Sequence, residues 1–305
     1  MKNIVQILGP TGAGKSRIAI AVAEKFDGEI VSADSVQVYC GFDIGTDKIN
    51  KENRGRVPHH LIDIIDDCSQ FNASRFLEAS FRAAEEIIAR GNLPVVCGGT
   101  AFYLRTMIRG IFPEVKDDAS IRERLQREAL KSGLEVLFER LSRIDPDYAR
   151  KIGSNDRIRI IRALEIHSLH KLPPSVVFQE TRTPFIDYNF IRVGLNVERK
   201  TLCESIDRRV DRMIADGLLE EVKRLRSLYP ASCPPFKAVG YKEMAMVLDG
   251  GIDLGQAIER IKRNTRRFAK RQMSWFRTEK DIRWFTPEET KPILNFLEGE
   301  IWNVR

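Results

Sequence analysis

The 305-residue chain has few cysteines, few histidines and no apolar run long enough to span a membrane. A spanning helix needs about 20 consecutive apolar residues. The N-terminus runs from Met1 straight into a short apolar segment, without the longer apolar region and cleavage site of a secretory signal. We therefore expect a cytoplasmic protein without a membrane partner.

The five cysteines are odd in number, widely spaced and never part of a C-x-x-C pair. They are Cys40, Cys68, Cys97, Cys203 and Cys233. Zinc sites and disulfide frameworks depend on paired or regularly spaced cysteines. The spacing therefore predicts a reducing compartment, with neither a zinc site nor a disulfide framework.

The composition is that of an ordinary globular protein with a basic surplus. Apolar residues make up 43%, charged residues make up 30%, and the net charge is +7. Many basic proteins have no acidic partner, so the total charge favours a nucleic-acid partner only modestly. The distribution of charge along the chain is more informative.

A glycine-rich loop follows the first apolar run. Its residues match G-x-x-x-x-G-K-[ST] and are Gly9, Pro10, Thr11, Gly12, Ala13, Gly14, Lys15 and Ser16. Glycines let backbone N–H groups turn around an anion, and a helix N-terminus adds its positive end. Lys15 is expected to reach terminal phosphate oxygens, and the Ser16 hydroxyl to hold Mg²⁺. The loop predicts a polyphosphate site without specifying the reaction.

Apolar runs alternate with amphipathic segments as far as Pro113. Strands are expected at Asn3–Leu8, Glu29–Ala33, Leu61–Ile65 and Leu93–Cys97, and helices at Ser16–Phe26 and Ser74–Arg90. This alternation predicts a parallel sheet with helices on both faces. Only helical patterns occur from Ala119 to His170. A further strand is expected at Phe190–Val197, and helices beyond Glu198.

The predicted fold class is α/β, with a P-loop nucleotide-kinase-like parallel sheet core and an all-helical insertion domain. Residues 1–117 are expected to form the first part of the core, and residues 118–188 the helical insertion. Residues 189–305 are expected to form the second part of the core, with basic C-terminal helices.

Two polar positions follow predicted strands at the ligand-binding edge of the sheet. Asp34 follows the second strand, and its alternatives are a metal-binding or basic carboxylate and a turn or helix cap. Thr100 follows Gly98-Gly99, and it is either a donor to a phosphate oxygen or a helix cap. No acidic residue closes the strand that ends at Cys97. Most P-loop phosphotransferases have an acid there, so its absence weakens a phosphoryl-transfer function.

A basic segment near the C-terminus, Glu259–Arg277, contains eight Lys and Arg residues and a single acidic residue, Glu259. Phe268, Trp275 and Phe276 lie between the cations. The segment is either a solvated helix face or, for an RNA substrate, a phosphate-binding surface.

Together these motifs resemble the tRNA dimethylallyltransferase family over nearly the whole chain. The matching residues, in order, are Gly9–Ser16, Ser32–Ser35 with Gln37–Tyr39, Asp43–Thr46, Pro58–Asp63, Gly98–Thr100, Asn155–Asp156 with Arg162–Glu165, Val239–Glu243 and Thr265–Gln272.

The resemblance implies that a dimethylallyl group passes from dimethylallyl diphosphate to the N6 amine of adenosine 37 of tRNA, 3′-adjacent to the anticodon. Asp34 resembles the general base, and Thr100 resembles the residue that contacts the diphosphate and the nucleotide. The diphosphate is expected at Gly9–Ser16 and Arg209, with Mg²⁺. The expected tRNA-binding residues include four from the basic segment. They are Asp34, Ser35, Val36, Gln37, Thr100, Arg122, Arg159, Arg162, Arg266, Arg267, Lys270 and Arg271.

Two positions depart from the family pattern. Ile158-Arg159 stands where the family often has Gln-Arg, so only the arginine carries over. Of the family's Arg-Ile-x-x-Arg pattern only Arg209 matches, which leaves open whether Arg208 or Arg209 contacts diphosphate. Arg162 has the alternative of an ion pair with Glu165 at i,i+3.

Three other functions compete with this hypothesis. They are a P-loop kinase for a small metabolite, an isopentenyltransferase for free adenine nucleotides, and an RNA-binding module without catalysis. The missing acid after Cys97 opposes the kinase, the large basic insertion opposes the nucleotide enzyme, and intact Lys15 and Asp34 oppose the RNA-binding module. A monomer is expected, with dimethylallyl diphosphate and the tRNA anticodon stem-loop as partners.

Overall fold

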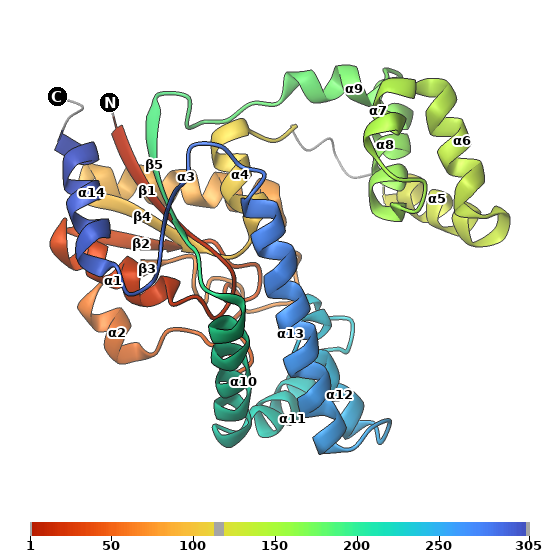
Figure 1. Ribbon diagram of the computed structural model, residues 1–305. Coiled ribbons are helices and arrows are strands. Elements are labelled where there is room, and N and C mark those ends of the chain that lie inside the picture. Colours follow the sequence, from red (N-terminus) through yellow and green to blue (C-terminus); the bar gives the residue numbers. More distant parts are fainter. Residues whose placement is uncertain (1, 113–118, 303–305) are drawn as a thin grey trace. The chain divides into compact units, whose positions relative to one another are not determined.

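The computed structural model describes residues 2–112 and 119–302, and its centre is a six-stranded parallel sheet (Figure 1). The strand order is β3-β2-β4-β1-β5-β6. The strands are β1 (Lys2–Leu8), β2 (Gly28–Ser32), β3 (His59–His60), β4 (Leu93–Gly98), β5 (Tyr188–Leu195) and β6 (Arg283–Phe285). The predicted α/β class with a parallel sheet is confirmed.

Helices cover both faces of the sheet, because alternate residues of each strand point to opposite sides. Val5 and Ile7 of β1 pack in one core with α1 (Lys15–Lys25) and α14 (Thr290–Trp302). Between them, the amide of Gln6 donates to the carbonyl of Leu104 in α4 (Ala101–Arg109) on the other face. The helix α3 (Ala73–Ala89) also contacts β2 and β4. Burial on both faces explains why the strands are nearly continuous apolar runs.

A second core lies beyond the carboxyl end of the sheet, among the C-terminal helices. These are α10 (Arg199–Ala215), α11 (Leu218–Leu228), α12 (Tyr241–Leu248) and α13 (Leu254–Phe276), with the 3-10 turn η2 (Pro234–Lys237). Phe42 and Tyr241 meet edge to face in this core, with ring centroids 5.1 Å apart. The short helix α2 (Lys51–Arg56) precedes β3.

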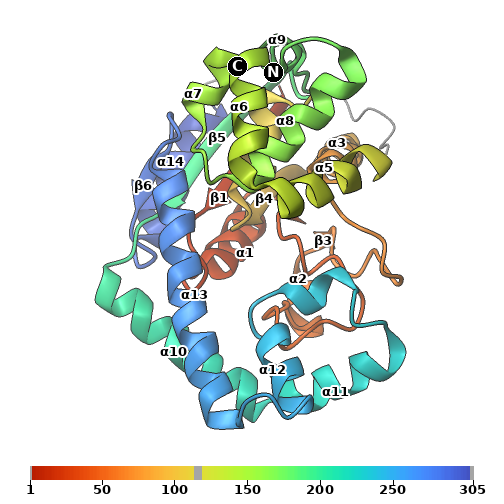
Figure 2. The same ribbon diagram turned by 90° about the vertical axis from the view of Figure 1, so that its right-hand side faces the viewer.

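The chain forms two compact units, Met1–Ile108 with Phe185–Arg305, and Arg109–Pro184. The second unit is all-helical apart from one isolated bridge between Ile111 and Arg182 among its described residues. Figure 2 shows its helices α5 (Ala119–Ser132), α6 (Leu134–Ile144), α7 (Pro146–Lys151) and α8 (Arg157–His170), followed by α9 (Pro174–Val177) and the 3-10 turn η1 (Phe178–Glu180). Leu137, Leu141 and Ile160 are central to its own core. The boundary expected between residues 117 and 118 lies outside the described residues.

Two strand predictions were wrong. The third strand ends at His60, because Leu61 and Asp63 have positive φ angles of 60° and 55° that break the extended backbone. The N–H groups of Ile64 and Ile65 instead donate to the carbonyl of Val38. The strand β6 lies where only helices were expected, and it pairs in parallel with β5.

One disulfide contradicts the prediction from cysteine spacing. Cys68 and Cys233 are bonded across a sequence separation of 165 residues. Cys68 lies in the loop before α3, and Cys233 lies just before η2. Both pack in the C-terminal core, so tertiary structure joins two loops that the sequence spacing does not relate. Cys40, Cys97 and Cys203 are free.

Within residues 2–112 and 119–302, each helix is too short or too polar to cross a bilayer.

A buried carboxylate ties together the amino ends of the neighbouring strands. The side chain of Glu29 in β2 is 4% exposed and accepts from Nε and Nη2 of Arg90 at 2.9 and 2.8 Å. Asn92 donates to it at 2.8 Å, and His60 Nε2 lies 2.7 Å away. The hydrogen bonds from Arg90, aided by His60 and Asn92, lower the Glu29 pKa to about 2.

We predict that Glu29→Gln lowers the free energy of unfolding at pH 7 by about 1 to 2 kcal/mol, because the hydrogen bonds from Arg90 and Asn92 lose a charged acceptor. A lowered carboxyl pKa stabilises the fold above its unfolded value near 4.5, and this contribution is lost as pH falls toward about 2. Urea unfolding should therefore show a smaller difference between wild type and variant at pH 3 than at pH 7. Glu24→Gln, at an exposed ion pair with Arg56, is the control and should change stability little. Equal losses of stability in the two variants would show that the hydrogen bonds to Glu29 do not stabilise the fold.

Candidate functional site

A cavity of about 730 Å³ lies at the carboxyl edge of the parallel strands. It brings together residues from loops far apart in the sequence. Its polar lining includes Thr11, Lys15, Ser16, Asp34, Ser35, Gln37, Thr46, Asp47, Thr100, Arg209, Lys242, Arg271 and Gln272. All belong to the first compact unit. Residues of the phosphate loop, Asp34 and Thr100 therefore lie around one cavity.

The phosphate loop leads directly into α1 without a capping side chain. The first turn of α1 contains no acidic residue, and Gly14 offers no side-chain hydrogen bond. The N–H groups of Gly12 and Ser16 donate none of the hydrogen bonds found among the described residues. Free N–H groups and the positive end of a helix favour an anion at this position.

The side chain of Lys15 folds back onto the phosphate loop, and its pKa is lowered. Its ammonium group donates to the carbonyl of Pro10 at 2.8 Å. Burial, aided by the charge of Arg209 and opposed by Cys97 and Asp34, lowers the pKa of Lys15 to about 8. An incoming anion would restore the charge that burial disfavours.

Arg209 of α10 reaches the same loop from the C-terminal core. Its guanidinium donates to Thr11 Oγ1 at 3.0 Å and to the carbonyl of Thr46 at 3.3 Å, and it pairs with Asp47 at 3.2 Å. Arg208 is exposed and does not line the cavity. Of these two arginines, Arg209 is the one in position to contact a ligand in the cavity.

Asp34 caps a turn and also faces the cavity. One carboxylate oxygen, Oδ1, accepts from the N–H groups of Val36 at 2.8 Å and Gln37 at 3.2 Å. The other, Oδ2, accepts no hydrogen bond from the part of the chain that the structure describes. The two roles left open by the sequence are therefore compatible, because the cap orients the carboxylate and leaves one oxygen for a ligand.

Thr100 stands at the start of α4. Its carbonyl accepts from the N–H of Tyr103 at 2.9 Å, and its own N–H donates to Ala33 at 3.3 Å. Its hydroxyl makes no hydrogen bond within residues 2–112 and 119–302 and lines the cavity. The backbone of Thr100 is thus used for structure, and its hydroxyl is free for a ligand.

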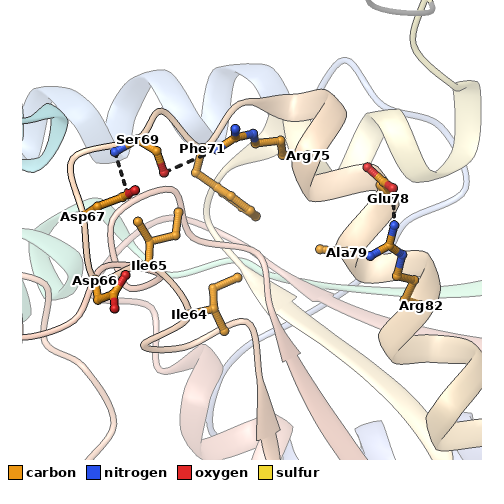
Figure 3. A pocket seen from close by; sticks show the side chains of 10 residues that line it. All are labelled: Ile64, Ile65, Asp66, Asp67, Ser69, Phe71, Arg75, Glu78, Ala79 and Arg82. Carbon is orange, nitrogen blue, oxygen red and sulfur yellow. Dashed lines mark hydrogen bonds and ion pairs between the residues drawn. The ribbon is translucent and has the colours of Figure 1, made fainter.

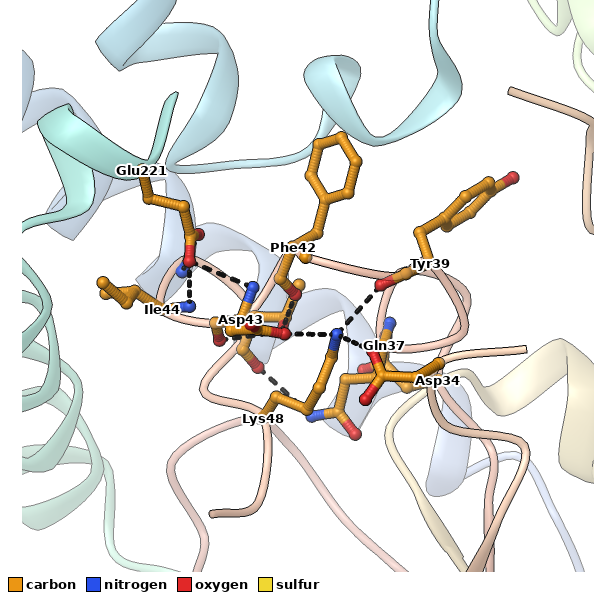
Figure 4. A network of polar contacts seen from close by, with 12 residues as sticks. Asp34, Gln37, Tyr39, Phe42, Asp43, Ile44, Lys48 and Glu221 are labelled. Atoms are coloured by element: carbon orange, nitrogen blue, oxygen red, sulfur yellow. Dashed lines mark hydrogen bonds and ion pairs between the residues drawn. The ribbon is translucent and has the colours of Figure 1, made fainter. Parts of the chain in front are cut away.

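A carboxylate outside the cavity holds one wall of it (Figure 4). Glu221 of α11 is buried and accepts from the N–H groups of Asp43, Ile44 and Gly45 at 2.8–3.2 Å. The hydroxyl of Tyr241 donates to it at 2.7 Å. The segment so held leads into Thr46, whose carbonyl accepts from Gln37 and Arg209. The sequence carried no signal for Glu221, because an acidic residue on an amphipathic helix is ordinary.

Gln272 of α13 links two cavity loops and was not among the predicted site residues. Its Oε1 accepts from the N–H of Thr11 at 2.9 Å, and its Nε2 donates to the carbonyl of Gly99 at 2.8 Å. A Cβ atom on residue 99 would lie 2.4 Å from Nε2 and would displace the amide from this position. The amide thereby fixes the spacing between the phosphate loop and the Gly98-Gly99-Thr100 turn.

Several predicted tRNA-binding residues lie elsewhere. Arg122, Arg159 and Arg162 belong to the helical unit. Arg122 and Arg162 both pair with the buried Glu165, at 2.9 and 3.1 Å, so the ion-pair alternative for Arg162 exists in the structure. Arg159 pairs with Asp156 at 2.6 Å.

On α13, the predicted cations differ in their surroundings. Arg266 is bound by both carboxylate oxygens of Asp207, at 2.5 and 2.7 Å. Arg267 and Lys270 are exposed, and Arg271 lines the cavity.

A second, smaller hollow of about 320 Å³ lies between α3 and the loop before it (Figure 3). Arg75 donates there to Ser69 and to the carbonyl of Gln70, and Arg82 pairs with Glu78. Its arginines are therefore engaged by neighbouring groups, and we assign it no function.

Comparison with known proteins gives concordant matches over nearly the whole chain. The family model described as IPP transferase matches residues 37–279. A tRNA dimethylallyltransferase of Geobacter metallireducens is 44% identical over 299 residues, covering 97% of each chain.

Two solved structures have a similar fold. The full-length tRNA isopentenylpyrophosphate transferase of Bacillus halodurans has a TM-score of 0.73 at 38% identity, over 98% of this chain and 96% of that one. A eukaryotic dimethylallyltransferase, whose structures show it acting on tRNA, has a TM-score of 0.85 at 30% identity. That similarity covers 99% of this chain and 80% of the eukaryotic one.

We predict that Gln272→Met weakens the binding of inorganic diphosphate about tenfold or more. The thioether leaves the Thr11 N–H and the Gly99 carbonyl unpaired, and each lost hydrogen bond is worth about 1 kcal/mol. Titration calorimetry measures the affinity, and Gln256→Met on the exposed start of the same helix is the matched control. Wild-type affinity in the Gln272 variant would show that the loops hold their spacing without the amide.

We also predict that diphosphate affinity falls as pH rises through about 8, because Lys15 loses its proton there in the free protein. Below that pH the ammonium is present and binding is strongest. In Lys15→Arg the guanidinium stays charged, so the contribution near pH 8 should disappear. An unchanged pH profile in Lys15→Arg, measured by the same titration, would assign the dependence to another group.

Proposed function

The chain belongs to the IPP transferase family, and on that premise we propose that it transfers the dimethylallyl group of dimethylallyl diphosphate to the N6 amine of adenosine 37 in tRNA. The product is N6-dimethylallyladenosine, and diphosphate is released. The observation that carries the proposal is the single cavity in which the phosphate loop, the open oxygen of Asp34 and the hydroxyl of Thr100 meet.

Asp34 is proposed as the general base. The adenine N6 amine is a weak nucleophile because its lone pair is delocalised into the ring. As N6 bonds to the allylic carbon, the carbon–oxygen bond to diphosphate breaks and N6 must lose a proton. The open Oδ2 of Asp34 takes that proton, a role typically worth 10²–10⁴-fold in rate.

The diphosphate leaving group is proposed to lie on the phosphate loop. Negative charge grows on it as the carbon–oxygen bond breaks, and charge stabilisation lowers this barrier. Lys15 and the free N–H groups of the loop supply positive charge from one side. Arg209, held by Asp47 and Thr11, supplies it from α10. The Thr100 hydroxyl is proposed to contact both the diphosphate and the nucleotide.

Mg²⁺ is the proposed cofactor, and the cavity suits it when the diphosphate is bound. The described residues contain no cluster of three or more acidic, histidine or cysteine side chains that would hold a metal alone. Mg²⁺ usually takes one or two protein oxygens together with phosphate oxygens and water. The Ser16 hydroxyl lines this cavity and offers such an oxygen. Bound there, Mg²⁺ would neutralise charge on the leaving group.

The target adenosine is proposed to enter beside Asp34, Ser35, Val36 and Gln37. It must leave its base stack, at a cost of a few kcal/mol. Contacts of Arg267, Lys270 and Arg271 with the RNA backbone are proposed to offset that cost, with Arg266 beside them. Arg122, Arg159 and Arg162 of the helical unit are proposed to bind the anticodon stem-loop. We further propose that the enzyme acts as a monomer.

Transfer of labelled dimethylallyl diphosphate to unmodified tRNA tests the function, with AMP, ADP and ATP as competing acceptors. We expect label in tRNA alone. Asp34→Asn keeps an oxygen to cap the turn but removes the base, so transfer should fall at least 100-fold. Its tRNA affinity should stay within a few-fold. Asp67→Asn, at an exposed turn capping Ser69, is the matched control and should transfer normally.

Label in free nucleotides would instead assign the chain to nucleotide-modifying relatives. Absence of label in every acceptor would return phosphoryl transfer to consideration. Substantial activity in Asp34→Asn would remove Asp34 as the base while leaving the overall reaction intact.

A further inference from the structure

Exposed aromatic side chains are concentrated on two helices beside the reaction cavity. Among the large hydrophobic residues that the described chain exposes, the aromatic ones are Phe102, Phe268 and Trp275, at 45%, 41% and 37%. Phe102 lies on α4, two residues after Thr100, and the other two lie on α13. Removing such rings from water is favourable, so their shared location requires an explanation.

The rings lie along one face of α13, from the cavity to the neighbourhood of α4. Phe268, Arg271 and Trp275 recur at i, i+3 and i+7, so they share one face of α13. Phe268 and Arg271 line the cavity. Trp275 lies farther along and meets Phe102 edge to face, with centroids 6.3 Å apart. Figure 1 shows α4 beside this end of α13.

An arginine accompanies each ring of α13. The guanidinium of Arg271 lies 5.8 Å from the centroid of Phe268, and that of Arg105 lies 4.6 Å from the ring of Trp275. Arg105 is held by Glu279, which is 4% exposed and accepts from Arg105 Nε at 2.7 Å. The Trp275 ring is therefore supported on one side by a fixed cation and remains more than one-third exposed.

We propose that Phe102, Phe268 and Trp275, with Arg105 and Arg271, form a stacking surface for the unpaired bases next to the target adenosine. The proposal rests on the proposed function and assigns the neighbouring nucleotides of the same tRNA to a site. Aromatic rings and guanidinium planes are the groups that hold unstacked bases of single-stranded RNA.

Length and charge both suit this occupant. Seven residues of α-helix span about 10 Å, which is room for two or three bases at about 3.4 Å each. Arg267, Lys270 and Arg277 are exposed on the same helix. Cations beside the rings match the alternation of phosphates and bases in a single strand. An uncharged partner would gain no binding energy from these cations.

Binding of an unmodified anticodon stem-loop, followed by fluorescence anisotropy, tests the proposal. Trp275→Ala and Phe268→Ala should each weaken binding about tenfold, as expected when one base loses its stacking partner. Because no phosphate contact is removed, the slope of log affinity against log salt should not change. Lys270→Ala should instead reduce that slope by about 0.7 to 1. Leu254→Ala, at another exposed apolar residue of α13, is the matched control.

Abasic nucleotides on either side of the target adenosine identify the contact. In the wild-type protein each abasic change should weaken binding, and in Trp275→Ala the change at the stacked position should cost no more. Non-additive losses are the signature of two groups in direct contact. Wild-type affinity in both alanine variants, or fully additive losses, would overturn the stacking surface. The transfer assay remains independent, because tRNA can be prenylated whether or not these rings bind bases.

Discussion

The close approach of two strand ends determines the geometry of the site. The N–H of Ala33 donates to Cys97 at 2.8 Å, and the N–H of Thr100 donates back to Ala33 at 3.3 Å. A Cβ on residue 98 would lie 2.2 Å from the Ala33 carbonyl oxygen, so only glycine permits this arrangement. As a result, Asp34 and Thr100 leave neighbouring strands at the same edge, facing the loop that follows β1. The separate roles proposed for base, hydroxyl and phosphate loop all depend on this short distance.

The helix α13 contributes both to that edge of the sheet and to the protein surface. Its buried face includes Ala257, Ile261 and Phe276, which anchor it in the protein interior. Gln272 lies on the same side and reaches into the cavity. The opposite side carries most of the basic residues, whereas Phe268 and Trp275 follow Ile261 at intervals of seven residues and therefore lie on the side of Gln272. One rigid element therefore sets both the spacing of the catalytic loops and the position of the surface proposed for RNA, so the two are aligned by a single helix.

The sequence predicted most of what depends on local pattern. The glycine loop, the apolar strands and the helical character of the insertion each follow from spacing along a short segment. Gln272, Glu221 and the Cys68–Cys233 bond escaped prediction because each depends on partners 165 or more residues away or on a burial that no local pattern encodes. The strand β6 has only three residues, too few to show an alternation. Leu61–Ile65 looked extended because four of its five side chains are apolar, but the positive φ angles there are a property of backbone packing.

Backbone hydrogen bonds join the two ends of the helical unit. Ile111 and Arg182 exchange backbone hydrogen bonds in both directions, at 3.1 and 3.4 Å. The two ends of the helical unit thus lie close together, although some seventy residues intervene. An insertion whose two ends lie close together does not constrain the distance between the elements on either side of it, just as a short loop does not. Such a module can be lengthened, shortened or exchanged over evolutionary time while the chemistry at the sheet edge is preserved.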